Sequence, residues 1–234
     1  MRFHCQTAGV TLTAQQPHNN IVRVAYQALA AVLGGAQSLH TNALDETLAL
    51  PTEESVRIAL RTQQILAHES GVPNVADPLG GSYYVEALTD EMEREAEALF
   101  AEIDAQGGVV AAIESGWFQR QIAHSAARFQ EQVESGQKVI VGVNEFAEAD
   151  EAPVEILRIG DAADQTQRTR LARLRSERDA DRVSRSLEAL GHAAVLDTNI
   201  IPAMLDCARS YCTLYEIRQI LERVYGAYHE PVFF

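Results

Sequence analysis

The sequence predicts an α/β protein, the C-terminal part of a (β/α)8 TIM barrel followed by a mainly helical region. A strand, an amphipathic helix and a second strand follow one another within residues 2–41, which is the pattern of a βαβ unit with parallel strands. Two parallel strands cannot bury both their faces, so further strands are expected beside them. From residue 163 onward the apolar residues recur with a helical period.

Each element of the βαβ unit has its own signal. Residues 2–7, "RFHCQT", alternate in character and predict a strand, and "AQSLHT" (36–41) predicts the second. Between them, "NNIVRVAYQALAAVLGG" (19–35) predicts a helix with an Asn cap that ends at Gly34 and Gly35. A further helix should begin after Thr52, a good N-cap, and stop at Gly71 and Pro73.

The middle of the chain predicts mostly helix. Thr89 is expected to open a long amphipathic helix that Gly107 and Gly108 close, with more helix in "VVAAIES" and "FQRQIAHSAARFQEQVES". The stretch "KVIVGVN" (138–144) predicts a short buried strand. The acidic stretch "EADEAP" (148–153) is the expected hinge, which gives domains at 1–147 and 148–234. Helical segments are then expected at about 163–191 and 199–225.

Composition narrows the class of protein. The chain has 33 acidic and 19 basic residues and a net charge of -14, so neither nucleic acid nor anionic lipid would attract it. Three cysteines match no metal motif, and the N-terminus has no apolar signal segment. No apolar run approaches the ~20 residues of a membrane span. These features predict a cytoplasmic protein with free thiols.

The candidate site lies where the two strands end, because ligands of parallel α/β folds sit at the carboxyl ends of strands. Gly9, in "QTAG" after the first strand, would let a ligand approach the backbone closely. Asn42 and Glu46, in "TNALDE" after the second, would share one face if the loop were helical and could hold a pair of hydroxyls. Alternatively, Asp45 and Glu46 merely begin a helix. Both interpretations remain open.

Other candidates carry weaker signals. His40 is expected to be a hydrogen-bonded core residue, and none of the seven histidines stands at a metal-ligand spacing. No metal site is therefore predicted. An arginine-rich stretch runs from Arg168 to Arg185; it indicates either a solvated helical face or a surface that docks an acidic partner.

Four long stretches resemble the large subunit of the methylmalonyl-CoA mutase family. They are "RFHCQTAGVTLTAQQPHNNIVR", "GGAQSLHTNALDETLALPTE", "DPLGGSYYVEALT" and "VIVGVNEF". The resemblance implies an isomerase that uses adenosylcobalamin for radical rearrangement of a branched acyl-CoA. Within the family, "GVTLTAQQPHNN" and "WFQRQIAHSAARFQ" are more similar to the isobutyryl-CoA and 2-hydroxyisobutyryl-CoA mutase branch.

The resemblance also implies roles for residues at the strand ends. Gly9 and Ala49 match positions at which the family's barrel packs on the corrin, and Gln6 faces the same cavity. Glu46 matches the carboxylate that holds the adenosyl ribose hydroxyls, with Asn42 beside it. These acids would therefore grip a cofactor rather than perform acid–base catalysis.

Gln37 and Ser38 match positions that line the acyl-CoA channel of the family. The first half of the barrel, with the family's catalytic Tyr, Arg and His, has no counterpart here, so no catalytic residue is predicted in this chain. The cobalamin-binding D-x-H-x-x-G signature is absent too.

The missing parts predict partners. We expect a separate cobalamin-binding subunit and an N-terminal barrel portion, and no activity of this chain alone. Exposed strand edges and apolar surface also favour a homo-oligomer. The acyl group stays open between methylmalonyl, isobutyryl and 2-hydroxyisobutyryl. The alternative is an inactive remnant that serves as an interaction or scaffold protein.

Overall fold

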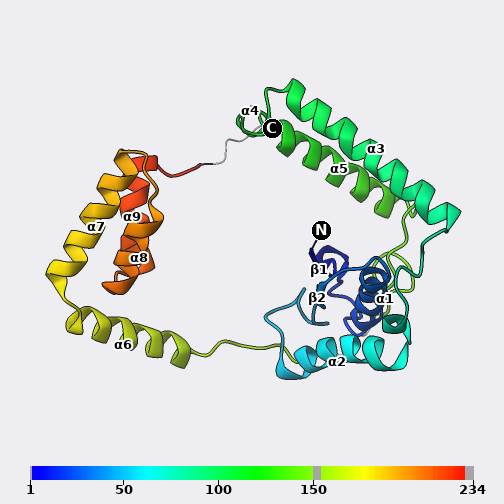
Figure 1. Cartoon of the computed structure of the whole chain (residues 1–234). Helices are drawn as coiled ribbons and strands as arrows, with labels where there is room; N and C mark the ends of the chain where they lie inside the picture. Colours follow the sequence, from blue (N-terminus) through cyan, green and yellow to red (C-terminus); the bar gives the residue numbers. More distant parts are fainter. Residues whose placement is uncertain (1, 150–153, 230–234) are drawn as a thin grey trace. The chain divides into compact units, whose positions relative to one another are not determined.

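A computed structural model of the chain describes residues 2–149 and 154–229 (Figure 1). Its internal contacts divide it into two compact units, one up to Arg158 and one from Ile159 onward. Among the described residues, no helix is long and apolar enough to cross a membrane. The expected hinge at 148–153 lies mostly outside the described residues, and the division into domains at 147 and 148 stays a prediction.

The first unit begins with the expected parallel strand–helix–strand arrangement. Its opening elements are β1 (His4–Gln6), the 3-10 turn η1 (Gly9–Thr11), α1 (Asn19–Leu33), β2 (Ser38–His40) and α2 (Glu53–Glu69). The two strands are parallel and form the two-stranded sheet of the described chain. The paired residues are His4 with Ser38, Cys5 with Leu39, and Gln6 with His40. The α/β character of the chain is confirmed, whereas a closed barrel is not seen.

The two faces of this sheet differ in polarity. Side chains alternate between faces along a strand, so the middle residues Cys5 and Leu39 share one face. Both residues are half-buried. Helix α2 contacts β2 through Gln63, whose Nε2 donates to the Leu39 carbonyl at 3.1 Å. The other face carries only polar, exposed side chains: His4, Gln6, Ser38 and His40. The expectation that His40 is a core residue is therefore wrong, because nothing in the described chain covers this face.

Most helix ends follow their sequence signals. Thr52 caps α2 as predicted, its side chain accepting from Ser55 N, and Gly71 ends the helix in the left-handed conformation with φ of 76°. Pro73 lies in the short 3-10 turn η2 (Val72–Asn74) that follows. α1 begins at Asn19, one residue after its N-cap, so the expected Asn cap is off by one position.

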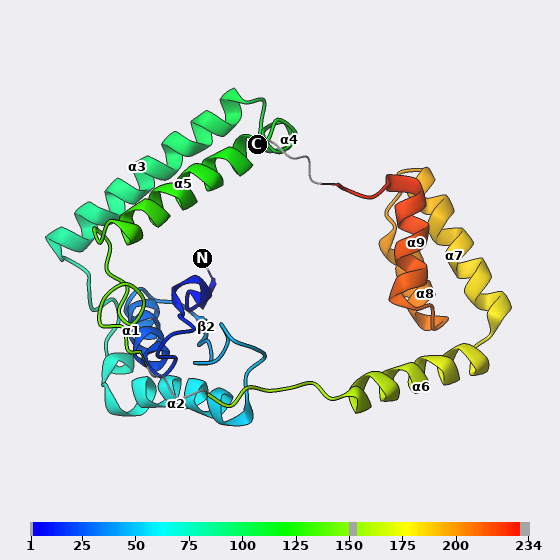
Figure 2. The same ribbon diagram turned by 180° about the vertical axis from the view of Figure 1, so that it is seen from behind.

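The next helices are α3 (Tyr83–Ala105), α4 (Val109–Glu114) and α5 (Trp117–Glu134). The predicted start of the long helix at Thr89 is wrong. Ser82, directly after the Gly80–Gly81 turn, caps α3 seven residues earlier, and Thr89 Oγ1 donates to the Val85 carbonyl inside the helix. In Figures 1 and 2, α3 and α5 run side by side.

The predicted buried strand at 138–144 is also wrong. Val139 and Val141 are 53% and 45% exposed, and the segment turns back on itself with a single bridge between Val141 and Glu145. Asn144 explains the turn: its Oδ1 accepts from Ile140 N at 2.7 Å, and its Nδ2 donates to the Lys138 and Val133 carbonyls, each at 2.8 Å. This side chain therefore pairs two backbone groups of the segment, on Lys138 and Ile140, and also holds the segment to the end of α5.

The second unit is helical, as expected, but each predicted segment is two helices. They are α6 (Asp161–Glu177), α7 (Ala180–Val195), α8 (Ile201–Arg209) and α9 (Leu214–Tyr225). α7 packs against both α8 and α9, with Leu190 and Cys207 fully buried between them. Helix α7 starts after Asp179, whose side chain accepts a hydrogen bond from Arg182 N. Helix α9 starts after Thr213, which forms a capping box with Glu216.

Candidate functional site

The carboxyl ends of β1 and β2 bring four of the predicted site residues together. Gln6 Nε2 donates to Asn42 Oδ1 at 3.0 Å, and Asn42 N donates to Thr7 Oγ1 at 2.9 Å. A Cβ atom added to Gly9 would lie 3.0 Å from Asn42 Nδ2 and 3.9 Å from Glu46 Oε1. The bare backbone at Gly9 therefore faces both polar side chains, and any larger residue there would crowd the amide.

Two polar groups in this cluster are left for a ligand. Asn42 is 2% exposed, yet its Nδ2 has no hydrogen-bond partner among the described residues. A buried donor without a partner is costly, so it indicates a missing acceptor. The Glu46 carboxylate is exposed and makes no hydrogen bond or ion pair within the described chain. Asn42 can donate and Glu46 can accept, which suits a ligand that carries hydroxyl groups.

Asp45 has a structural role that differs from that of its neighbour. Its side chain is fully buried, and its Oδ2 accepts from Thr52 N at 3.0 Å and from Ser55 Oγ at 2.7 Å. Residues 44–48 form a turn, in which Leu48 N and Ala49 N both donate to the Asp45 carbonyl, and no helix continues from it. The two acids, which the sequence could not tell apart, therefore have different roles. Asp45 supports the start of α2, whereas the Glu46 carboxylate is free to contact a ligand.

We expect Asp45→Ala to destabilise the first unit by about 2 kcal/mol, because the Thr52 amide and the Ser55 hydroxyl lose their acceptor. Chemical denaturation followed by circular dichroism measures this. Glu46→Ala is the matched control, since its carboxylate has no partner in the described chain. Equal stability of the two variants would contradict the assignment of Asp45 as the support.

Asn20 is a supporting residue that sequence reasoning missed. It is fully buried in the first turn of α1, and its Nδ2 donates to the carbonyls of Thr13 and Leu44, each at 2.9 Å. Its Oδ1 accepts from Thr13 N at 3.1 Å and from Arg23 Nη1 at 2.8 Å. One amide therefore joins the segment after Gly9 to the turn that carries Glu46. A polar residue within the apolar face of the helix was the available signal.

The other predicted residues lie elsewhere. Ala49 is half-buried at the end of the turn after β2. Gln37 and Ser38 lie at the amino end of β2, so the structure does not bring them to the Gly9 cluster. Gln37 Oε1 accepts from Phe3 N at 2.8 Å, and Ser38 Oγ is 2.8 Å from His4 Nδ1.

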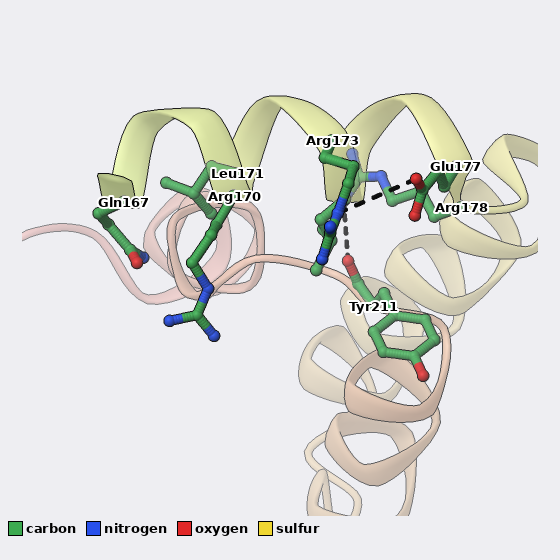
Figure 3. Close-up of a pocket in the computed structure, with 8 residues that line it drawn as sticks. Gln167, Arg170, Leu171, Arg173, Glu177, Arg178 and Tyr211 are labelled. Atoms are coloured by element: carbon green, nitrogen blue, oxygen red, sulfur yellow. Dashed lines mark hydrogen bonds and ion pairs between the residues drawn. The ribbon is translucent and has the colours of Figure 1, made fainter. Parts of the chain in front are cut away.

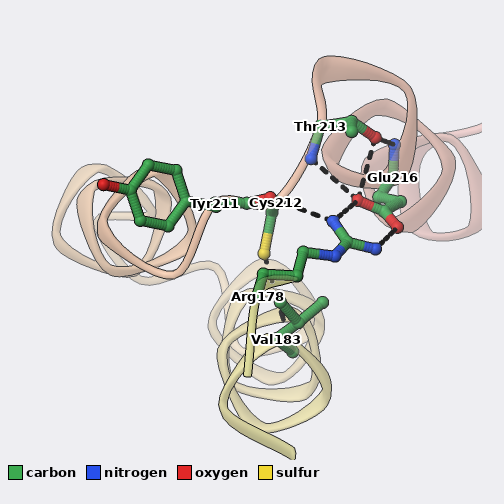
Figure 4. Close-up of polar contacts among 6 residues, drawn as sticks. All are labelled: Arg178, Val183, Tyr211, Cys212, Thr213 and Glu216. Carbon is green, nitrogen blue, oxygen red and sulfur yellow. Dashed lines mark hydrogen bonds and ion pairs between the residues drawn. The ribbon is translucent and has the colours of Figure 1, made fainter. Parts of the chain in front are cut away.

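In the second unit the strongest polar contact joins the α6–α7 junction to α9 (Figure 4). Arg178 donates to both carboxylate oxygens of Glu216 and, at 2.9 Å, to the Tyr211 carbonyl. This guanidinium lowers the pKa of Glu216 to about 2. Burial raises the pKa of the nearby Cys207 thiol to about 12, so it stays protonated at neutral pH. We assign this cluster to the stability of the unit.

A parallel βαβ edge with polar groups gathered at its carboxyl ends is typical of ligand-binding α/β proteins. The model of the methylmalonyl-CoA mutase family matches residues 1–227, and the chain therefore belongs to that family. The family predicted from the sequence is confirmed.

Individual relatives agree with this assignment. The chain is 47% identical over 233 residues to methylmalonyl-CoA mutase of Cereibacter sphaeroides, covering 99% of this chain and 33% of the relative. It is 47% identical over 236 residues to the 2-hydroxyisobutanoyl-CoA mutase large subunit of Aquincola tertiaricarbonis, covering 100% of this chain and 42% of the relative. The chain is 44% identical to the Escherichia coli methylmalonyl-CoA mutase, covering 99% of this chain and 32% of the relative. The chain thus spans 32–42% of the length of these relatives.

Proposed function

We propose that the chain is part of an adenosylcobalamin-dependent acyl-CoA mutase, an isomerase that rearranges the carbon skeleton of a branched acyl-CoA. The observation that carries the proposal is the cluster of Gly9, Asn42 and Glu46, in which a free carboxylate and an unpartnered amide face a bare backbone. Membership of the family supports it.

The residues present fit the adenosyl part of this cofactor. Glu46 would accept hydrogen bonds from the two ribose hydroxyls, and Asn42 Nδ2 would donate to an acceptor beside them. Gly9 and Ala49 would lie against the corrin, where small residues permit close approach. When bound, adenosylcobalamin supplies the radical chemistry. The part of this chain is to bind, to orient and to keep water away from the reacting groups.

The polar face of the sheet supports a path for the substrate. His4 and Ser38 lie at its amino end, and Gln6 and His40 at its carboxyl end. A barrel interior is ordinarily filled by branched apolar side chains, which leave no passage. Exposed polar side chains on this face suit a channel for acyl-CoA, with Ser38 and the neighbouring Gln37 at one end of it.

Further subunits complete the enzyme in this proposal. A separate cobalamin-binding subunit and an N-terminal barrel portion would supply what the chain lacks, because the chain matches only part of each relative. In the cytoplasm, this assembly would be active and the chain alone inactive. The acyl group is set by residues outside this chain, and both named relatives at 47% identity remain models for it.

Glu46→Ala tests the proposed function. The chain is mixed with a cobalamin-binding subunit and with the part of the Aquincola large subunit that lies outside the match. Adenosylcobalamin is then titrated and followed by corrin absorbance and acyl-CoA isomerisation. We expect Glu46→Ala to weaken binding by about 10- to 100-fold, the effect of losing charge-assisted hydrogen bonds.

Two controls make this test specific. Glu54→Ala removes an exposed carboxylate from the first turn of α2 and should leave binding unchanged. Hydroxocobalamin lacks the adenosyl group, so its binding should be insensitive to Glu46→Ala. If the complete mixture neither binds the cofactor nor turns over, the proposed function is wrong.

A further inference from the structure

The arginine-rich helix α6 forms one wall of an open groove of about 480 Å³ in the second unit (Figure 3). One face of α6 supplies most of the lining, and Tyr211 from the α8–α9 connection supplies the rest. We call this the α6 groove; its lining residues are Gln167, Arg170, Leu171, Arg173, Leu174, Glu177, Arg178 and Tyr211. The site described above does not use it.

The α6 groove offers positive charge that the chain itself does not neutralise. Arg170 makes no hydrogen bond or ion pair among the described residues. Arg173 has only a long contact of 3.9 Å with Glu177, and both side chains are largely exposed. Arg178, in contrast, is held by Glu216. Two guanidinium groups are thus available on a chain whose net charge is -14, which makes the groove a local attractor of anions.

The floor of the groove is apolar. Leu171 and Leu174 are three residues apart on the same helix face and are only half-buried. An apolar floor between two arginines suits a ligand with both an apolar and an acidic side. A simple inorganic anion would use the arginines but not the leucines.

Tyr211 is held in the groove wall at a conformational cost. It occupies the left-handed position after the end of α8, with φ of 59°, a place where glycine is usual. The hydrogen bonds from Tyr211 N to the Ala208 carbonyl and from Cys212 N to the Cys207 carbonyl, both 3.0 Å, are those of a Schellman motif. A tyrosine at this position, 63% exposed, gains little from burial, and such strain is typical of functional positions.

We propose that the α6 groove binds an acidic amphipathic helix of a partner protein. The lining runs from Gln167 to Arg178, about 16 Å along α6, which matches three turns of a bound helix. Tyrosine and arginine around an apolar centre are the residues that dominate binding energy at protein interfaces. The bound helix would place its apolar residues on Leu171 and Leu174 and its carboxylates against Arg170 and Arg173. This inference does not depend on the proposed mutase function.

The test uses the full 234-residue chain and a fluorescein-labelled 16-residue helical peptide with leucines on one face and four glutamates flanking them. Fluorescence anisotropy measures its affinity. We expect Arg170→Glu together with Arg173→Glu to weaken binding at least tenfold. Arg175→Glu is the matched control, because it also reverses an exposed arginine of α6 but does not line the groove. It should leave the affinity within about twofold, the residual effect of net charge.

A second variant addresses the strained tyrosine. Tyr211→Gly removes the ring and relieves the left-handed strain, so it should weaken binding several-fold without lowering the melting temperature. No peptide binding to the wild-type chain would overturn the proposal. Equal weakening by Arg175→Glu, or the same affinity for a peptide with glutamine in place of glutamate, would overturn it too, since binding would then not depend on charge in the groove.

Discussion

Arg178→Ala is expected to lower the free energy of unfolding of the second unit by about 3 kcal/mol, since it leaves a largely buried carboxylate without its partner. The Arg178 and Glu216 side chains are only 12% and 22% exposed, and the arginine also holds the Tyr211 carbonyl. Hydrogen exchange of the α7–α9 amides measures the loss in this unit specifically. Arg168→Ala, which breaks the exposed pair with Asp164, should change stability by less than about 0.5 kcal/mol.

The Arg178–Glu216 pair also predicts that the stability of the second unit depends on pH. Glu216 has a folded pKa of about 2, below its ordinary value of 4.5. The stabilisation is therefore fully present above pH 4.5 and is lost as the pH falls toward 2. The size of the shift corresponds to about 3 kcal/mol. The Arg178→Ala variant should lack this acid-dependent component, and a parallel loss of stability in both proteins between pH 5 and 2 would contradict the assignment.

Asn20→Leu is expected to destabilise the first unit by about 3–4 kcal/mol. The leucine fills the space but leaves the Thr13 amide and the Thr13 and Leu44 carbonyls without partners in a buried place. Because this amide joins the segment after Gly9 to the Glu46 turn, exchange of amides in residues 10–13 and 44–49 should accelerate together.

Asn19, the residue before Asn20, provides a control for this prediction. Asn19→Leu removes only the bond from Asn19 Nδ2 to Gln16 Oε1 at the helix start and should cost less than about 1 kcal/mol. If Asn19→Leu and Asn20→Leu have equal effects, the Asn20 amide does not connect the two site segments. The measurement is chemical denaturation of both variants under identical conditions.

The elements with local signals could be predicted from the sequence. The Thr52 cap, the stop at Gly71 and the parallel pairing of residues 4–6 with 38–40 all follow from neighbouring residues or from a short βαβ connection. The gathering of Gly9, Asn42 and Glu46 follows from the same parallel pairing, because the carboxyl ends of both strands meet at one edge.

The errors arise where the hydrogen bonds of a particular side chain, rather than the local pattern of apolar residues, decide the structure. The segment 138–144 has the composition of a strand, but Asn144 closes it into a turn. Asp45 and Glu46 are chemically alike in sequence, and only the contact of Asp45 with Ser55, ten residues away, separates their roles. The sequence predicts a buried His40, but a core around it requires elements that the described chain does not supply.

In the short strands β1 and β2, alternate residues lie on different faces of the sheet and have different environments. Cys5 and Leu39 are half-buried on one face of the sheet, whereas their neighbours on the polar face are exposed. A saturation mutagenesis of residues 4–6 and 38–40 should therefore separate into two phenotypes with a period of two. Substitutions at the middle positions should reduce the yield of folded protein, and those at the flanking positions should leave the yield unchanged. The polar face of the sheet can therefore change in sequence while the folded structure is kept.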